Sequence, residues 1–139
     1  MTNLSPYEQI LTESKHFIIT HEFETVILYQ KHTNRKVVIG DFYGEPEKAF
    51  ISEQEHFCVI YGCGMIIYYL REPFQPYKYH EITNQWLEFG RDEPYLWITA
   101  AKILNNSHIE ITLETGETKI ITQDGEQLEM GKILSIRRK

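Results

Sequence analysis

Long hydrophobic runs are missing from this 139-residue chain. The longest apolar run covers residues 65–70 (MIIYYL), which is the length of a strand and far short of the roughly 18–20 residues that span a bilayer. Residues 1–14 (MTNLSPYEQILTES) contain neither a basic region nor an apolar core, so we expect no signal peptide. The sequence therefore predicts a cytoplasmic protein that does not associate with membranes.

Cysteine is scarce, and the chain has only Cys58 and Cys63. The two side chains could face each other across a hairpin, but reduced thiols suit a cytoplasmic protein better. A chain of this length can bury roughly two-thirds of its unfolded surface, so it needs neither a disulfide nor a structural metal. Its 42% hydrophobic and 24% charged residues are typical of a globular protein. We expect a single domain over residues 1–139.

Positive charge is in short supply, with 14 Lys and Arg against 20 Asp and Glu. Three of the positive residues end the chain, so residues 1–136 carry 11 positive and 20 negative charges. This balance disfavours nucleic-acid binding, which depends on clustered Lys and Arg. It would suit a basic partner, although moderate negative charge also serves simply to keep a small protein soluble.

Motifs for catalysis, metal binding or phosphate binding are also absent. The six histidines lack metal-site spacing, and His56 and Cys58, which would share a strand face, have no obvious third ligand. Cys63 stands between two glycines but has no neighbouring base or cation to activate it. Acidic residues are plentiful in turns, yet spacing alone cannot define a catalytic pair. We expect a non-enzymatic protein with no cofactor and no metal.

Short runs of β-branched and aromatic residues, separated by turn formers, are what the chain has in abundance. In the central segment they cover residues 36–39, 49–52 with 56–61, and 65–70, which predicts consecutive strands of an antiparallel meander. Residues 57–61 and 65–70 are apolar on both faces, so these strands should be covered on both sides.

Further strands are predicted on either side of this segment. Residues 16–20 and 25–30 should form strands, with a turn at 31–35, and residues 95–99 should begin another. Residues 86–90 fit either a strand or a turn.

The C-terminal third shows the clearest alternation, with Ile109, Ile111 and Leu113 on one face and charged or polar residues on the other. A two-residue loop at Thr115-Gly116 would place Leu113 opposite Thr118, Ile111 opposite Ile120 and Ile109 opposite Thr122. A second turn is expected at Asp124-Gly125 and a last strand over residues 132–136. Because one face of the strand at residues 109–113 is charged, the hairpin that contains this strand should lie outermost.

One helix is expected, near the N-terminus. Ser5 suits an N-cap, Pro6 the first helical position and Glu8 the third, while Tyr7, Ile10 and Leu11 would share an apolar face. The prediction for the whole chain is thus a mostly β domain. Its antiparallel meander would form a sandwich, an open barrel or a propeller-like sheet, with one short N-terminal helix as a lid.

Candidate binding residues come from the acidic turns around residues 41–47 and from the proline-containing stretch 71–85 with its surroundings. Long loops often carry binding residues, and Tyr and Trp anchor protein interfaces, although some of these rings are expected to pack the core. The predicted binding residues, all acidic or aromatic, are Asp41, Tyr43, Glu45, Phe74, Tyr77, Tyr79, Trp86, Asp92 and Glu93.

Residues 39–70 (IGDFYGEPEKAFISEQEHFCVIYGCGMIIYYL) resemble a pattern in small uncharacterised bacterial proteins. Some of those proteins resemble immunity partners, which neutralise toxins of neighbouring cells. The resemblance favours a non-enzymatic protein-binding domain, in one form an immunity-type inhibitor that occludes a basic toxin. The alternative is a ligand-binding β-barrel or sandwich, with an aromatic-lined pocket for a carbohydrate or a small apolar molecule.

Overall fold

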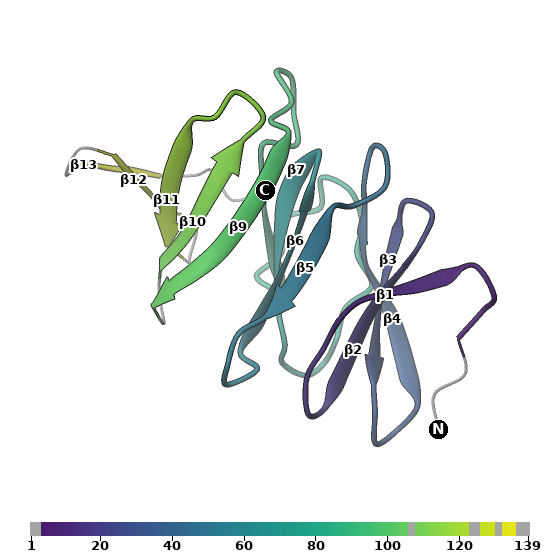
Figure 1. Ribbon diagram of the computed structural model, residues 1–139. Helices are drawn as coiled ribbons and strands as arrows, with labels where there is room; N and C mark the ends of the chain where they lie inside the picture. The colour runs from purple at the N-terminus through teal and green to yellow at the C-terminus, as the bar shows by residue number, and fades with distance from the viewer. Residues whose placement is uncertain (1–3, 106–107, 123–125, 130–131, 136–139) are drawn as a thin grey trace.

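The computed structural model describes residues 4–105, 108–122, 126–129 and 132–135. Within these residues the chain forms thirteen strands in three antiparallel sheets and no helix, so the mostly β prediction is confirmed. Each sheet is built from strands that follow one another in sequence, and none of the three closes on itself (Figure 1). No helix that could span a membrane occurs in the described part of the chain.

The strands are short, and most of them follow the runs expected from the sequence. The first sheet contains β1 (Glu8–Glu13), β2 (Phe17–Glu22), β3 (Thr25–Gln30) and β4 (Arg35–Asp41). The second contains β5 (Lys48–Ile51), β6 (Phe57–Gly62), β7 (Gly64–Tyr69) and β8 (Trp86–Phe89). The third contains β9 (Ile98–Asn105), β10 (His108–Leu113), β11 (Thr118–Thr122), β12 (Glu126–Glu129) and β13 (Lys132–Ser135).

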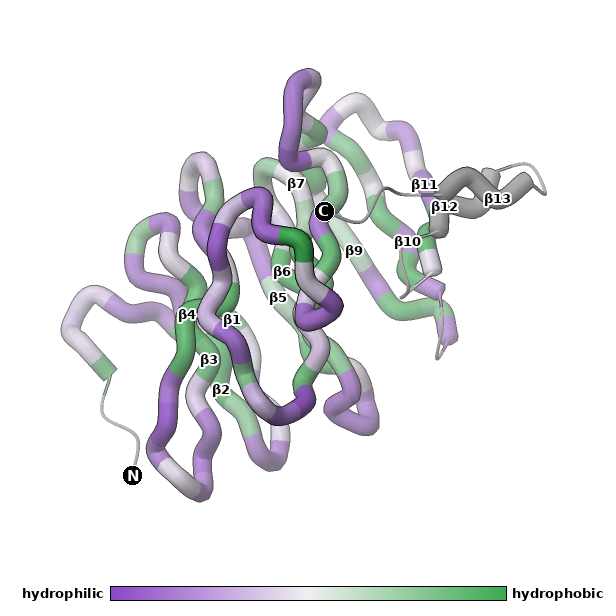
Figure 2. Tube along the Cα trace, turned by 180° about the vertical axis from the view of Figure 1, so that it is seen from behind, coloured by the Kyte–Doolittle hydropathy of each residue, from purple (hydrophilic) through white to green (hydrophobic). Residues whose placement is uncertain are grey.

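The second sheet lies between the other two (Figure 1). One of its faces packs on the first sheet, in a core that includes Ile19, Leu28, Cys58, Ile60 and Tyr68. Its other face packs on the third sheet, in a core that includes Val59, Met65, Ile67, Ile109 and Ile111. Every residue of β6 is buried, which confirms that the doubly apolar strands are covered on both sides. Figure 2 shows hydrophobic residues along these strands and hydrophilic residues in the turns.

The expected N-terminal helix is not formed. The capping residues produce a single turn, in which the Ser5 N–H donates to the Glu8 carboxylate at 2.7 Å and the Glu8 N–H donates to the Ser5 carbonyl at 3.1 Å. From Glu8 onward the chain pairs with β2 instead. Glu8 then accepts hydrogen bonds from the hydroxyls of Thr20 and Tyr29, across the first sheet. Sheet pairing therefore overrides a genuine helix-start signal.

The hairpin between β10 and β11 has the predicted position but a different register. Ile109 lies opposite Ile121 and Ile111 opposite Lys119, because the loop has three residues rather than two. The Leu113 N–H donates to the Glu117 carbonyl, and Gly116 adopts a φ of 91°. A type I turn followed by a left-handed glycine produces such a loop. The extra residue turns Ile121, rather than Ile120, toward the core with Ile109.

Four further predictions concern boundaries that the structure defines more closely or that lie outside the described residues. Residues 95–97 precede the strand that was predicted to begin there, and β9 starts at Ile98. Of residues 86–90, for which either a strand or a turn was expected, Trp86–Phe89 form a strand, β8. The expected turn at Asp124-Gly125 and the end of the last predicted strand at Ile136 lie outside the described residues. Cys58 and Cys63 are both buried free thiols, as the reduced form requires.

A polar cluster outside the core joins the first sheet to the second. We call it the Glu55 clasp, and it consists of Ser14 and His16 before β2 and Glu55 before β6. The Glu55 carboxylate accepts hydrogen bonds from the Ser14 hydroxyl, from the His16 backbone N–H at 2.9 Å and from His16 Nδ1 at 2.6 Å. Burial alone would raise the pKa of Glu55, but the hydrogen bonds from Ser14 and His16 lower that pKa to about 2.

The clasp should make stability depend on pH. Because the folded-state pKa of Glu55 lies below the unfolded value, its contribution is present above about pH 4.5 and is lost as pH falls toward 2. We expect Glu55→Gln to lower the free energy of unfolding at pH 7 by about 1–3 kcal/mol. Urea unfolding between pH 2 and 7 should show a shallower acid decline in E55Q than in the wild type. Glu53→Gln, an exposed change on the same turn, is the matched control, and equal slopes in both variants would contradict the account.

The turn between β6 and β7 depends on Gly64. This residue has a φ of 85°, and an added Cβ would lie 2.7 Å from Arg91 Cδ and 2.9 Å from the Gly90 carbonyl oxygen. Gly116 has a similar φ of 91°, but an added Cβ there would meet nothing within 4 Å.

These two glycines form a matched pair for measuring the cost of the close contact. Gly116→Ala should lower the free energy of unfolding only by what a positive φ costs an alanine, about 1–2 kcal/mol. Gly64→Ala should destabilise the protein by about 1–3 kcal/mol more, because backbone and Arg91 must also move. Urea unfolding of both variants measures the difference, and equal costs would show that the packing around Gly64 is not tight.

Candidate functional site

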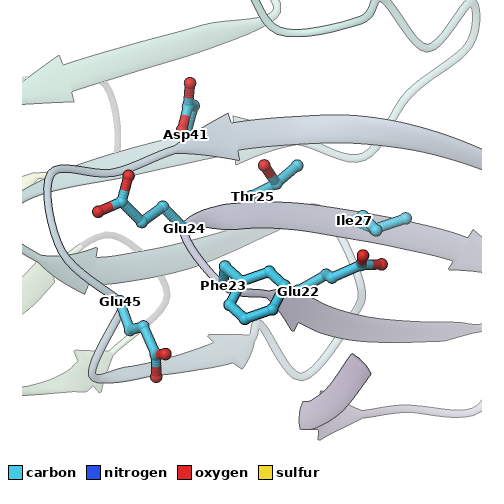
Figure 3. A pocket seen from close by; sticks show the side chains of 7 residues that line it. All are labelled: Glu22, Phe23, Glu24, Thr25, Ile27, Asp41 and Glu45. Carbon is cyan, nitrogen blue, oxygen red and sulfur yellow. The ribbon is translucent and has the colours of Figure 1, made fainter. Parts of the chain in front are cut away.

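Two neighbouring cavities lie where β4 leaves the first sheet and the chain crosses to the second. The acidic cavity has a volume of about 550 Å³ and is lined by Glu22, Phe23, Glu24, Thr25, Ile27, Asp41 and Glu45 (Figure 3). The aromatic cavity has a volume of about 280 Å³ and is lined by Glu24, Asp41, Phe42, Tyr43, Cys63, Tyr79, Arg91 and Tyr95. Because both cavities share Glu24 and Asp41, we treat them as one candidate surface.

The β2–β3 hairpin positions the centre of the acidic cavity. Glu22 pairs with Thr25, so Phe23 and Glu24 form a two-residue loop. Phe23 adopts a φ of 56° and leaves 60% of its surface exposed. A bulky residue with positive φ is uncommon, and the first position of such a loop normally takes glycine. Phe23 also stacks on Tyr7, with 5.9 Å between ring centroids. The loop therefore holds the exposed Phe23 ring at a position whose backbone conformation favours glycine.

The carboxylates of the acidic cavity accept hydrogen bonds but form no ion pair with a cation among the residues that the structure describes. Glu24 accepts a hydrogen bond from the Gly44 N–H at 2.9 Å, and Glu22 accepts one from the Ser5 hydroxyl at 3.1 Å. Among the described residues, no ion pair joins Glu22, Glu24, Asp41 or Glu45 to a Lys, Arg or His. Figure 3 shows these side chains spread around Phe23 rather than converging on one point. This agrees with the finding that the described residues contain no metal-binding group of three ligands.

Exposed tyrosines form the walls of the aromatic cavity. Tyr43, which is 71% exposed, stacks on Tyr95 with 6.2 Å between ring centroids and 20° between ring planes. Tyr43 also contacts Trp97, at 6.4 Å. The Tyr79 hydroxyl donates a hydrogen bond to the Arg91 carbonyl at 3.3 Å. This bond ties the Tyr79 ring, which lies in the β7–β8 connection, to the segment that follows β8. The walls therefore combine aromatic faces with hydroxyl groups, as protein-binding surfaces often do.

Arg91 forms the floor of the aromatic cavity. Its side chain is only 7% exposed and pairs with the equally buried Glu88, with Nε 3.0 Å from Oε1. Its guanidinium also donates to the carbonyls of Asp41 and Cys63, at 2.5 and 3.3 Å, and to the Tyr77 hydroxyl at 3.1 Å. Four of the five N–H groups of the guanidinium are thus engaged. The floor is electrically neutral and offers little to an anion.

Two aromatic rings enclose the same guanidinium. Its central carbon lies 4.5 Å from the centroid of Phe42 and 5.6 Å from that of Tyr79. Burial alone would lower the pKa of Arg91, but Tyr77 and Glu88 raise it, so the side chain stays charged. Burial raises the pKa of the Cys63 thiol, which is the opposite of what an activated nucleophile needs.

The structure brings together four of the predicted binding residues. Asp41, Tyr43, Glu45 and Tyr79 all line the candidate surface. Asp92 and Glu93 are exposed in the turn after β8 but line neither cavity, and Asp92 lies 3.1 Å from His80.

The other three predicted residues pack inside or at the edge of the first core. Trp86 is 1% exposed and contacts both Tyr68 and Tyr77. Tyr77 is 8% exposed, and its hydroxyl donates to Glu88 at 2.8 Å. Phe74 is half-buried against Phe17. Trp86 and Tyr77 belong to the core between the first two sheets, and Phe74 packs against that core. These three rings therefore do not belong to the candidate surface.

Sequence reasoning missed Phe23, Glu24 and Arg91. A phenylalanine in a two-residue hairpin loop is an unusual turn residue, and this signal could have identified Phe23. No sequence signal distinguishes Arg91, because its partners come from four separate parts of the chain.

The buried pair on the cavity floor yields a stability test. Arg91→Met leaves Glu88 buried without its partner, so it should lower the free energy of unfolding by about 3–5 kcal/mol. The double variant Arg91→Met/Glu88→Leu should recover part of that loss, since it removes both charges. Arg35→Met, which breaks the exposed pair with Glu72, is the control and should cost less than about 1 kcal/mol. A cost for R91M no larger than that of the control, measured by urea unfolding, would show that the buried pair does not organise the site.

Comparisons of this chain with protein-family models, with curated proteins and with solved structures found no match. Its function is therefore inferred from the candidate surface alone.

Proposed function

We propose that this protein binds a basic protein partner through the candidate surface and acts by covering the partner's cationic site. One observation carries the proposal. Glu22, Glu24, Asp41 and Glu45 surround a concave surface, have no cationic partner within the described residues and lie beside exposed aromatic rings. Carboxylates with no internal counter-ion favour a positively charged surface from outside.

The chemistry of the surface suits protein recognition. Tyrosine and phenylalanine supply large contact areas, with polar hydroxyls where tyrosine reaches water. The surrounding carboxylates would speed the encounter with a basic protein and would disfavour acidic competitors. The net charge of −6 acts in the same direction over longer distances.

An immunity-type inhibitor is the form of this function that we favour. Occlusion requires only binding, and the candidate surface is better suited to binding than to catalysis. Its carboxylates diverge, and its cysteine is buried with a raised pKa. We also propose a cytoplasmic location, for which the two free buried thiols are a support.

We propose that the sheets carrying this surface form a propeller-like stack. Successive four-stranded meanders packed face to face are the arrangement that propellers use, and the binding residues lie in connections at one end of the first two sheets.

A small-molecule site is the second candidate. The near-parallel rings of Tyr43 and Tyr95, close to Trp97, support an aromatic-lined pocket for a carbohydrate or a small apolar molecule. A screen of sugars by thermal shift separates this candidate from protein binding, because a bound ligand raises the melting temperature.

Affinity capture from the native organism tests the main proposal. The bait is compared with Glu24→Gln/Asp41→Asn/Glu45→Gln, which removes three charges but keeps hydrogen-bonding side chains. The matched control is Glu53→Gln/Glu81→Gln/Glu114→Gln, which removes three exposed charges elsewhere. We expect wild type and control to retain the same basic protein, and the surface variant to retain at least about tenfold less, since each buried charge contact contributes about 1 kcal/mol or more. Equal capture by all three baits, or the absence of a basic protein, would contradict the proposal.

A further inference from the structure

We infer that the aromatic cavity receives a single arginine side chain of the basic partner. The inference rests on the proposed function and specifies which group of the partner enters the candidate surface and where. Glu24 and Asp41 would meet the guanidinium at the mouth of the cavity, and Tyr43, Tyr79 and Tyr95 would enclose it.

The charges of the cavity select a cation. Glu24 and Asp41 belong to both cavities, so their carboxylates stand at the boundary between them. The positive charge of Arg91 is balanced by Glu88 and is turned toward backbone carbonyls and Tyr77. An entering anion would therefore meet carboxylates at the mouth and almost no free donor at the floor, whereas a cation would meet partners of opposite charge.

The rings favour a planar cation over a compact one. A guanidinium stacks on aromatic faces and pairs with carboxylates through two N–H groups, whereas an ammonium acts as a strongly hydrated point charge. The site already holds one guanidinium against aromatic rings, because Arg91 lies against both Phe42 and Tyr79. Tyr43 and Tyr95 present a second pair of rings, with only 20° between their planes.

The size of the cavity favours a side chain over a whole ligand. Its volume of about 280 Å³ lies just below the range for small-molecule pockets, which is roughly 300–1,000 Å³. The acidic cavity next to it is larger, at about 550 Å³, and has only one aromatic ring. We assign the arginine to the aromatic cavity and leave the acidic cavity for basic residues that flank it in the partner.

Three capped tripeptides test the inference directly: acetyl-Gly-Arg-Gly-amide, the corresponding lysine peptide, and the citrulline peptide, in which the side chain keeps its shape but loses its charge. Binding is followed by NMR titration of the aromatic side-chain resonances at low salt. We expect the arginine peptide to bind at least about tenfold more tightly than the citrulline peptide, and several-fold more tightly than the lysine peptide.

Variants locate the binding. Tyr43→Leu keeps apolar volume but removes the ring, and Tyr95→Ala removes the ring that stacks on it. Each should weaken binding of the arginine peptide by about three- to thirtyfold. Ile82→Ala removes an exposed apolar side chain that lines neither cavity and should leave the affinity unchanged.

The outcomes separate this inference from the proposed function. Citrulline or lysine binding as tightly as arginine would overturn the inference, and so would an effect of I82A as large as that of Y43L. If the capture experiment succeeds while the arginine peptide fails to bind, the partner docks without an arginine in this cavity. If the arginine peptide binds as expected but no basic protein is captured, the site is a cation pocket and the proposed protein-binding function is wrong.

Discussion

The buried Arg91 is the constraint on which the candidate surface depends. Its guanidinium connects the end of the first sheet at Asp41, the β6–β7 turn at Cys63, the loop residue Tyr77 and Glu88 of β8. A buried charge is costly unless it is paired and hydrogen-bonded, and Arg91 meets both conditions only when these four segments are in place. Gly64 is part of the same constraint, because a side chain there would collide with the Arg91 stem.

This arrangement separates stability from recognition. The two sheet interfaces and the Glu55 clasp hold the layers together without using the carboxylates of the candidate surface. Arg91 takes one carboxylate, Glu88, out of water, and Glu24, Asp41 and Glu45 form no ion pair with any cation in the described part of the chain. The fold thus builds a neutral floor beneath an acidic, aromatic rim, which is a surface that a basic partner can complete.

Much of the fold could be predicted from the sequence, but only part of the site. Strands such as β3 and β6 were predictable because their runs of β-branched and aromatic residues are local signals. The prediction of an N-terminal helix was wrong because Glu8 makes its decisive contacts with Thr20 and Tyr29, which no local pattern reveals. Likewise, Tyr43 and Trp86 are both aromatic residues near turns, and only the tertiary packing makes one exposed and the other buried. Arg91 could not be identified for the same reason, since three of its partners, Asp41, Cys63 and Tyr77, are distant in sequence.

Hydrogen–deuterium exchange of the protein, with and without the basic protein that we expect affinity capture to retain, tests the central claim most directly. If the candidate surface is the interface, bound partner should slow exchange in residues 22–25 and 41–45 and in the segment 91–97, while residues 52–56 and 114–117 keep their free rates. Protection confined to those last two segments, with no change at the candidate surface, would contradict the account.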